Sequence, residues 1–388
     1  MSTDLTSIKP VLPGSTVGIL GSGQLGRMLA FVAKRMGYTV VVFSDQQDSP
    51  AGQVADLELV GSYNDEALLR KFGEACDVIT YEFENIPSNS CRILEEFAPV
   101  RPNPEAIFLT QNRARERELL TGLGIPVAPY HHIAEEKDIA SLPADFTFPA
   151  ILKAASFGYD GKGQQAVSSR ADLDESWNAL GQVECVLEER LQFAKEFSIV
   201  VARAVDGSIV TYGPIENHHE KHILDLSFYP SEIAAEVSEL ASDYAKQIAE
   251  KLGVLGVITI EFFLMKNNSP IVNEIAPRPH NSGHLTIEGF RASQFEQQLR
   301  GVCGLPLGSV ESLTPVAMVN LLGELWNDDG DLTTAHVFQH PKAFLHLYGK
   351  TEPRSGRKMG HLTVVASDLT EAKSTALQLR DAMSCARS

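Results

Sequence analysis

The chain has 388 residues, of which 44% are hydrophobic and 21% charged, an ordinary composition for a globular protein of two or three domains. Its net charge of −17 argues against a general binder of nucleic acid or of anionic membranes, because both need a dominant basic surface. The five cysteines are scattered without metal-ligand or redox spacing, the start has no signal-peptide pattern, and no apolar run reaches the length of a membrane span. We therefore expect a cytoplasmic protein with no nucleic-acid or membrane partner.

The first hundred residues alternate between strand and helix patterns. Residues 16–20 have the pattern of an apolar strand, 27–37 of an amphipathic helix closed by a glycine, and 38–43 of the next strand. A further strand is predicted at 77–81. This alternation predicts a parallel, doubly wound sheet.

A turn with three glycines, residues 21–26, joins the first predicted strand to its helix. It matches the dinucleotide-binding fingerprint, and Asp45 lies near the spacing of a ribose-binding acid, which would indicate NAD. The same glycines could instead serve a tight turn whose amide groups bind any phosphate. From this motif alone, both interpretations stay open.

Residues 99–104 are rich in proline and predict a domain boundary, followed by a charged helix at 112–122. Beyond it, a strand ending at Lys153 leads to a loop at 158–164 that contains three glycines and Lys162. The amide groups of such a loop can close over phosphate oxygens while the lysines supply positive charge. It is no Walker A motif, because neither Ser nor Thr follows Lys162. A flexible hairpin tip would explain the glycines, but not a lysine on a buried strand.

A predicted helix at 233–252 leads into a strand pair, 257–265 and 270–274, with a turn composition between the two strands. If this hairpin folds symmetrically, Glu261 and Glu274 lie opposite each other on one face, with Cβ atoms about 4.5–5.5 Å apart. Two carboxylates this close need a cation between them, and hard oxygen ligands suit Mg²⁺. The alternative is a solvent-facing pair, and a register slip of one residue would separate the two side chains.

Three further polar segments are candidates for ligand binding. The segment 273–284, which follows the hairpin, concentrates a carboxylate, an arginine and two histidines. The histidines within 216–222 fit no zinc spacing, so we expect a polar loop that touches a ligand. A cationic run near the C-terminus could be a solvated turn or could bind phosphate in this acidic chain. The run consists of Lys350, Arg354, Arg357 and Lys358.

These segments occur together and in the order found in the ATP-grasp superfamily, and they most closely resemble its 5-(carboxyamino)imidazole ribonucleotide synthase family. The resemblance runs from about residue 16 to about residue 365 and rests on motifs at 21–29, 81–86, 158–164, 273–284 and 356–361. It implies a fold of class α/β and α+β. The implied domains are an N-terminal Rossmann-like domain at 1–108, an ATP-grasp domain at 109–305 and a small β-rich domain at 306–388.

The resemblance also implies an ATP site and a metal site. Glu261 and Glu274 would hold Mg²⁺, the expected cofactor, and Ala276 stands where many relatives have an asparagine as a further ligand. A basic pair, the glycine loop, the adenine-side strand and a ribose-binding acid would surround the nucleotide. The residues expected at ATP are Arg113, Lys153, Gly158, Tyr159, Asp160, Gly161, Lys162, Gly163, Gln164, Glu188, Glu189, Arg190, Leu191, Glu196, His219, Asn273 and Glu274.

A ribonucleotide substrate would bind between the domains, so that the first glycine turn serves this substrate and not a dinucleotide. The residues expected to contact it are Gln24, Leu25, Glu82, Tyr159, Asp160, Arg278, His280, Asn281, Lys350, Arg357 and Lys358. The last three basic residues would grip its 5′-phosphate. The expected catalytic residues are Asp160, Arg278, His280 and Lys350, and either Asp160 or His280 would move the amine proton.

The implied reaction is the N-carboxylation of 5-aminoimidazole ribonucleotide by ATP and bicarbonate through carboxyphosphate, in a protein expected to form a homodimer. The nearest alternative is a formate-dependent glycinamide ribonucleotide transformylase. That family lacks the pair Tyr159 and Asp160 and has a different sequence at 281–283. An NAD-dependent dehydrogenase would leave the hairpin and the glycine loop unexplained, and a non-catalytic nucleotide-binding regulator would not need both metal carboxylates.

Overall fold

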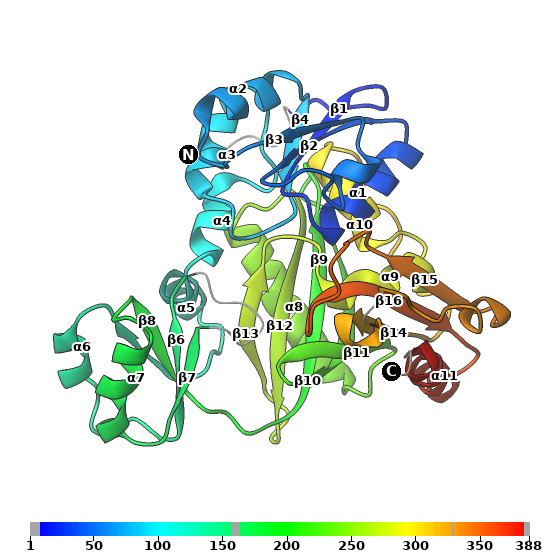
Figure 1. Ribbon diagram of the computed structural model, residues 1–388. Coiled ribbons are helices and arrows are strands. Elements are labelled where there is room, and N and C mark those ends of the chain that lie inside the picture. Colours follow the sequence, from blue (N-terminus) through cyan, green and yellow to red (C-terminus); the bar gives the residue numbers. More distant parts are fainter. Residues whose placement is uncertain (1–7, 157–162, 328–329, 384–388) are drawn as a thin grey trace.

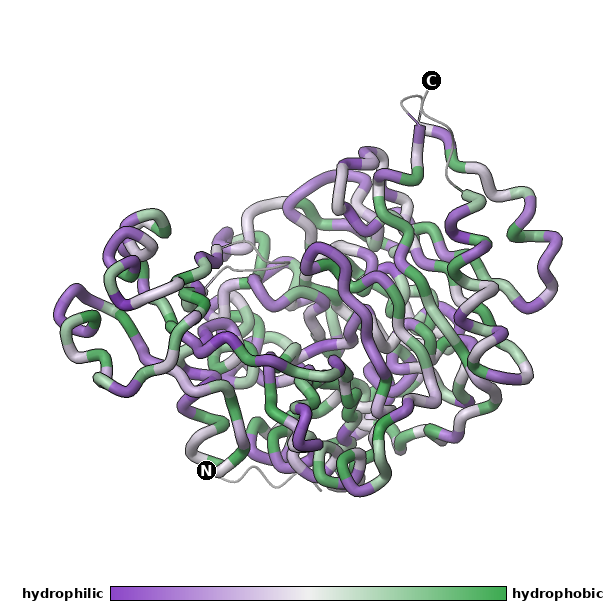
Figure 2. The backbone as a smooth tube through the Cα atoms, turned by 90° about the horizontal axis from the view of Figure 1, so that it is seen from below, coloured by the Kyte–Doolittle hydropathy of each residue, from purple (hydrophilic) through white to green (hydrophobic). Residues whose placement is uncertain are grey.

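The computed structural model describes residues 8–156, 163–327 and 330–383, and the strands in these ranges form three sheets. Figure 1 shows the N-terminal sheet above a long central sheet, with a small sheet in a lobe that projects to one side. The same lobe projects from the larger body in the perpendicular view of Figure 2. Within the described ranges, no helix is both long and apolar enough to cross a membrane.

The N-terminal sheet is parallel throughout, which confirms the prediction made from the alternating pattern. Its strands follow the order β3-β2-β1-β4, with β1 at Thr16–Leu20, β2 at Thr39–Ser44, β3 at Leu57–Val60 and β4 at Val78–Tyr81. Helix α1 (Gln24–Arg35) covers one face together with α10 (Gln294–Val302), while α2 (Glu66–Glu74) and α3 (Ser88–Leu94) cover the other. Helix α1 begins earlier than predicted, since Gly26 is already helical.

The projecting lobe is built on an antiparallel sheet of order β5-β8-β6-β7. Its elements are β5 (Tyr130–Ile133), α6 (Glu136–Ala140), β6 (Ala150–Ala154), β7 (Gln164–Val167), α7 (Leu173–Ala179) and β8 (Cys185–Glu189). Leu152 and Leu187 of the sheet pack with Trp177 of α7 in a separate apolar core. The strand predicted before the glycine loop is therefore confirmed as β6.

The central sheet has eight strands in the order β13-β12-β9-β10-β11-β14-β16-β15, and every neighbouring pair is antiparallel. The strands are β9 (Phe193–Arg203), β10 (Ile209–Glu220), β11 (Ile223–Tyr229), β12 (Gly256–Met265), β13 (Pro270–Ala276), β14 (Val316–Leu322), β15 (Ala343–Leu347) and β16 (Lys358–Val365). The last three strands thus extend the sheet that carries the glutamate hairpin.

Helices cover both ends of this sheet. Helix α8 (Ala235–Lys251) packs on β9, β12 and β13 with α4 (Pro104–Thr110) and α5 (Arg113–Gly122), and α11 (Leu369–Met383) packs on β14 and β16. The short helix α9 (Thr286–Gly289) follows the polar exit of the hairpin. Among the described residues, the 3-10 helices are Gly52–Val54, Arg170–Asp172, η4 (Asn281–Leu285), Gly323–Leu325 and Val337–Gln339.

The hairpin of β12 and β13 pairs Glu261 with Glu274, as the sequence predicts. The route to this register differs from the symmetrical hairpin that was expected. The loop between Met265 and Ser269 has three residues, one more than a symmetrical two-residue turn, and the amide of Asn268 donates to the carbonyl of Met265 at 2.9 Å. A bulge at Asn273 restores the pairing. Asn268 has a φ of 65°, a left-handed conformation that asparagine adopts readily.

Candidate active site

Glu261 and Glu274 face each other across the hairpin, and each carboxylate has one basic partner. Nε2 of His280 lies 2.9 Å from Oε1 of Glu261, and a guanidinium nitrogen of Arg113 lies 3.5 Å from Oε2 of Glu274. Burial alone would raise the pKa of Glu261, but His280, His219 and Lys358 lower it well below its usual range. Glu261 is therefore an anion in the folded protein.

The donor set of this pair suits Mg²⁺, which binds a few carboxylates and completes its shell with phosphate oxygens and water. The side chain of Glu274 is 42% exposed and thus open to a ligand. Among the residues that the structure describes, no cluster of three or more acidic, histidine or cysteine side chains could hold a metal by itself. The residues present therefore fit an ion shared with a bound nucleotide, not a closed structural metal site.

Lys153 lies in a buried ion-pair network that joins the small sheet to the hairpin. Its Nζ lies 2.5 Å from Oε2 of Glu188, and Nε of Arg117 donates to the other oxygen of Glu188 at 2.7 Å. Arg117 also donates to the carbonyl of Asn273 at 2.8 Å. Burial would raise the pKa of Glu188, but Lys153 and Arg117 lower it to about 2, so the carboxylate keeps its charge. The network thus holds the lysine at the proposed phosphate position.

Glu116 and Arg117 belong to this network and were missed by the sequence analysis. Glu116 bonds Arg117 at 2.6 Å and accepts a hydrogen bond from the amide of Ile275 at 3.0 Å. Burial raises the pKa of Glu116 to about 7. A signal was present: on a helix, Glu116 and Arg117 share one face with the buried Leu120. Charged residues on the apolar face of a helix indicate buried partners elsewhere.

The first glycine turn binds a side chain of the protein itself. The amides of Gly23 and Gly26 donate to the carboxylate of Glu82 at 2.8 and 3.2 Å. A Cβ atom at Gly21 would lie 2.9 Å from the Glu82 side chain, so the glycines permit this close approach. Burial raises the pKa of Glu82 despite the two amide donors. A carboxylate occupying these amides leaves no free phosphate cradle, which argues against the dinucleotide interpretation.

The two other residues predicted on this turn have different environments. The side chain of Leu25 is buried in the apolar core between α1 and the sheet, so only its backbone could reach a ligand. Gln24 is the first residue of α1 and is partly exposed. Gln24 and Glu82 are therefore the two candidates for a side-chain contact in this domain, and the carboxylate of Glu82 already accepts two backbone hydrogen bonds.

The hairpin exit brings Arg278 and Asn281 to the same region. Arg278 forms an ion pair with Glu84, which was not predicted as a site residue, and its pKa is held above its usual range although burial opposes the charge. The buried amide of Asn281 has no hydrogen-bond partner among the described residues. An unpartnered buried amide is costly unless a ligand satisfies it. This observation supports Asn281 as a ligand contact.

The cationic run lies at the start of β16. Nζ of Lys350 donates to the carbonyl of Lys358 at 2.7 Å and lies 5.6 Å from the ring centre of Tyr348. Arg357 donates to the carbonyl of Glu352 at 2.9 Å. The charge of Lys358 contributes to lowering the pKa of Glu261. The structure therefore places this end of the run toward the glutamate pair.

The ribose side of the predicted ATP site borders a cavity of about 470 Å³. Glu196 and His219 line it and form an ion pair; burial opposes a charged imidazole, but Glu196 raises the pKa of His219. His218 and His219 lie on β10, so the expected polar loop at this position is wrong. Glu220 pairs with Ile223 of β11 and extends β10 through this segment, so that only Lys221 and His222 form the turn.

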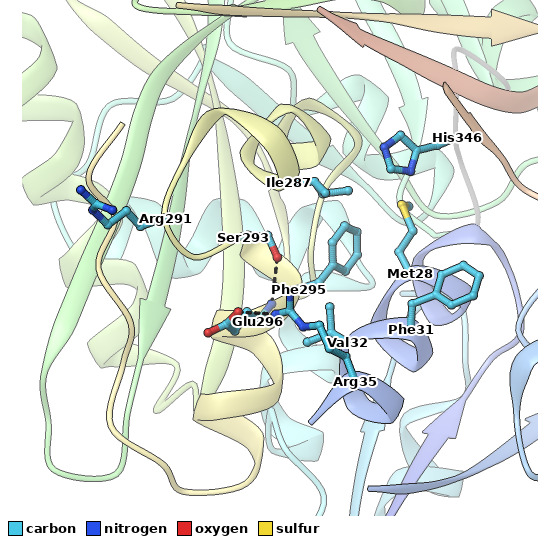
Figure 3. A pocket seen from close by; sticks show the side chains of 10 residues that line it. All are labelled: Met28, Phe31, Val32, Arg35, Ile287, Arg291, Ser293, Phe295, Glu296 and His346. Carbon is cyan, nitrogen blue, oxygen red and sulfur yellow. Dashed lines mark hydrogen bonds and ion pairs between the residues drawn. The ribbon is translucent and has the colours of Figure 1, made fainter. Parts of the chain in front are cut away.

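A different cavity, of about 220 Å³, lies between α1 and α10 (Figure 3). Half of its ten lining residues are apolar, and the others include an ion pair of 2.5 Å between Arg35 and Glu296. It contains none of the residues predicted for ATP or substrate, so it carries no part of the site.

The other predicted ATP contacts lie around the small sheet. Oε1 of Glu189 accepts from the amide of Thr147 at 3.2 Å, and the amide of Arg190 donates to the carbonyl of Pro149 at 3.0 Å. Gln164 pairs with Lys153 on the neighbouring strand, and the carbonyl of Gly163 accepts from the amide of Ala154 at 2.9 Å. The predicted residues Gly158, Tyr159, Asp160, Gly161 and Lys162 lie outside the described residues. Leu191 lies two residues after the end of β8.

Comparison with known protein families gives the class of this fold and site. An ATP-grasp domain model matches residues 118–295, a ribonucleotide synthetase preATP-grasp domain model matches 14–111, and a phosphoribosylaminoimidazole carboxylase C-terminal domain model matches 316–375. The chain is thus an ATP-grasp protein with the two flanking domains of a ribonucleotide synthetase.

Individual relatives narrow this class. N5-carboxyaminoimidazole ribonucleotide synthase of Bacillus subtilis is 41% identical over 91% of this chain and 92% of its own length. A solved N5-carboxyaminoimidazole ribonucleotide synthetase in complex with ADP superposes with a TM-score of 0.89 at 40% identity, covering 97% of this chain and 99% of its own. An Aspergillus clavatus N5-carboxyaminoimidazole synthase, in complex with ADP and 5-aminoimidazole ribonucleotide, has a TM-score of 0.87 at 31% identity, covering 95% and 99%. The chain belongs to the N5-carboxyaminoimidazole ribonucleotide synthase family.

Proposed function

We propose that the protein carboxylates the exocyclic amine of 5-aminoimidazole ribonucleotide with ATP and bicarbonate, as an ATP-dependent ligase of purine biosynthesis. The observation that carries the proposal is that residues expected at ATP and residues expected at the ribonucleotide meet at the glutamate hairpin. On one side, Arg113 links Glu274 to the region of Lys153. On the other side, His280 contacts Glu261. Phosphoryl transfer and amine carboxylation would therefore share the glutamate hairpin.

At the nucleotide end, Lys153 and Arg113 would neutralise charge on the transferring phosphoryl group. Glu261 and Glu274 would hold Mg²⁺, which supplies further neutralisation of the phosphate oxygens. The strand end at 188–191 would lie beside the adenine, and Glu196 with His219 would bind the ribose. The loop residues 158–164 complete this assignment by the family resemblance.

At the ribonucleotide end, Glu82 and Asn281 would bind the sugar or base, and the run at Lys350, Arg357 and Lys358 would bind the 5′-phosphate. ATP would phosphorylate bicarbonate, and the resulting carboxyphosphate, or CO₂ released from it, would meet the amine. Arg278 would stabilise the carboxylate that forms. A closed site would exclude the water that destroys carboxyphosphate.

The reaction is tested by following ADP release with ATP, Mg²⁺, bicarbonate and 5-aminoimidazole ribonucleotide, and by detecting the carboxylated amine. Omitting either bicarbonate or the ribonucleotide should reduce product formation to background. Formate with glycinamide ribonucleotide should not replace them. Turnover with formate, or ADP release that depends on neither bicarbonate nor the ribonucleotide, would overturn the proposal.

Three further properties rest on the family resemblance. We infer a homodimer, a cytoplasmic location and a division into domains at 1–108, 109–305 and 306–388. The four cysteines in the described ranges are free and buried, which fits a reducing compartment. Sedimentation analysis at several protein concentrations tests the dimer, which a monomer at all concentrations would contradict.

A further inference from the structure

We infer that a buried chain of polar side chains fixes the tautomer of His280, so that His280 donates a hydrogen bond into the active site through Nε2 and does not act there as a base. The chain runs through Ser227, Asn217, Ser198 and Ser282. The inference deepens the proposed function, because it rests on His280 facing the reacting groups.

The four side chains come from three neighbouring strands and from η4, and all are at most 5% exposed. The hydroxyl of Ser227 donates to Oδ1 of Asn217 at 2.7 Å, and Nδ2 of Asn217 donates to Oγ of Ser198 at 3.1 Å. Oγ of Ser198 lies 2.7 Å from Oγ of Ser282. Oγ of Ser282 lies 2.9 Å from Nδ1 of His280. The chain therefore ends on one particular nitrogen of the imidazole.

The direction of each hydrogen bond follows from the first donor. Ser198 already accepts from the amide of Asn217, so its own proton is directed to Oγ of Ser282. Ser282 in turn directs its hydroxyl proton to Nδ1 of His280. The backbone amide of Ser282, which can only donate, also points to Nδ1 at 3.3 Å. In the neutral imidazole, two donors at Nδ1 place the ring proton on Nε2.

Nε2 is the nitrogen that faces the reacting groups. It lies 2.9 Å from Oε1 of Glu261, where the N–H donates to the carboxylate. A ring in this tautomer has no lone pair directed at the substrate, since the lone pair of Nδ1 is taken by Ser282. His280 therefore orients and stabilises negative oxygen atoms, and the amine proton passes to another group.

A buried polar chain of this length has a cost unless each member is satisfied. Here every side chain within the chain of hydrogen bonds accepts from one neighbour and donates to the next. Thr259 on β12 provides the contrast: its buried hydroxyl has no partner among the described residues. It lies on the same strand as Glu261 but outside the chain, so Thr259→Val is a matched control that removes a buried hydroxyl.

The tautomer is measured directly by ¹⁵N NMR of histidine-labelled protein without substrate, with His280 assigned from the spectrum of His280→Gln. We expect Nε2 to carry the proton in the wild type and in Thr259→Val. Ser282→Ala removes the hydroxyl donor. Asn217→Asp keeps the side-chain shape but can only accept, which reverses the direction of the chain. Both variants should shift the proton toward Nδ1.

The same variants should lower kcat about tenfold, the effect of one misplaced hydrogen bond in the transition state. The KM for ATP should change less than about twofold, because His280 does not contact the nucleotide in this assignment. Thermal melting shows which variants fold, and only folded variants are compared. The two variants perturb the chain in different ways, one by removing a donor and the other by reversing its direction. A proton on Nδ1 in the wild type, or an unchanged tautomer and kcat in a folded variant, would overturn the inference. Because the tautomer is read without substrate, its failure is separate from a failure of the proposed reaction.

Discussion

The substitution Glu274→Gln removes one negative charge from the proposed metal site and leaves the side-chain volume unchanged. The structure predicts that stability and activity respond very differently. The side chain of Glu274 is 42% exposed and its ion pair with Arg113 is long, at 3.5 Å. Exposed pairs of this kind contribute about 0–1 kcal/mol. Losing a group that stabilises charge in the transition state costs about 10²–10³ in kcat.

The assay is ADP release at saturating ATP, bicarbonate and ribonucleotide over a titration of Mg²⁺, with thermal melting measured in parallel. We expect the melting temperature to stay within a few degrees while turnover falls by two to three orders of magnitude. Glu239→Gln on the exposed face of α8 is the matched control and should change neither quantity. Turnover of Glu274→Gln within a few-fold of wild type, with the same Mg²⁺ dependence, would refute the metal assignment.

Three other predictions address the ribonucleotide, the buried network and the glycine turn. Arg357→Ala should raise the KM for the ribonucleotide about tenfold to a hundredfold, because a charge-assisted hydrogen bond contributes about 1.5–3 kcal/mol. The KM for ATP should not change, Arg291→Ala should alter neither constant, and equal losses for both substrates would mean a structural role. Arg117→Ala should cost about 3–5 kcal/mol of unfolding free energy, since Glu188 and Glu116 lose their shared cation in the interior; denaturant unfolding with a loss under 1 kcal/mol would contradict this. Calorimetry should detect no NAD(H) binding, and micromolar affinity would revive the dehydrogenase interpretation.

Local sequence patterns were sufficient for the elements that flank the site. Strands β1, β2 and β4 and helix α1 each have their own periodicity, and a helical crossover between strands is typical of parallel pairing. The pairing of Glu261 with Glu274 was also predicted, but two departures from the expected hairpin cancel. The longer loop shifts the register by one residue and the bulge at Asn273 shifts it back. Sequence indicated the result because side-chain burial, and not the turn alone, selects the register.

Contacts between residues far apart along the chain were not predicted from the sequence. The strands β14, β15 and β16 continue the sheet of the hairpin, although 39 residues, 277–315, lie between β13 and β14. The burial of Arg117 depends on Glu188 and on the carbonyl of Asn273, which come from two different sheets. The role of Glu82 depends on its hydrogen bonds with the amides of Gly23 and Gly26. The sequence motif alone would assign these amides to a phosphate. In each case the partner that decides the role lies far away in sequence.

Contacts between residues far apart in sequence also hold the segment that follows β13 in place. Arg278 leaves the end of β13 and pairs with Glu84 after β4, so one ion pair joins the N-terminal sheet to the central sheet. His280, two residues on, pairs with Glu261 of β12. Breaking a largely buried pair leaves an uncompensated charge, which is strongly unfavourable. The two pairs therefore hold Arg278 and His280 in place before a substrate binds. A carboxylate or phosphate that binds there replaces the anion already present, so no free side chain has to become ordered.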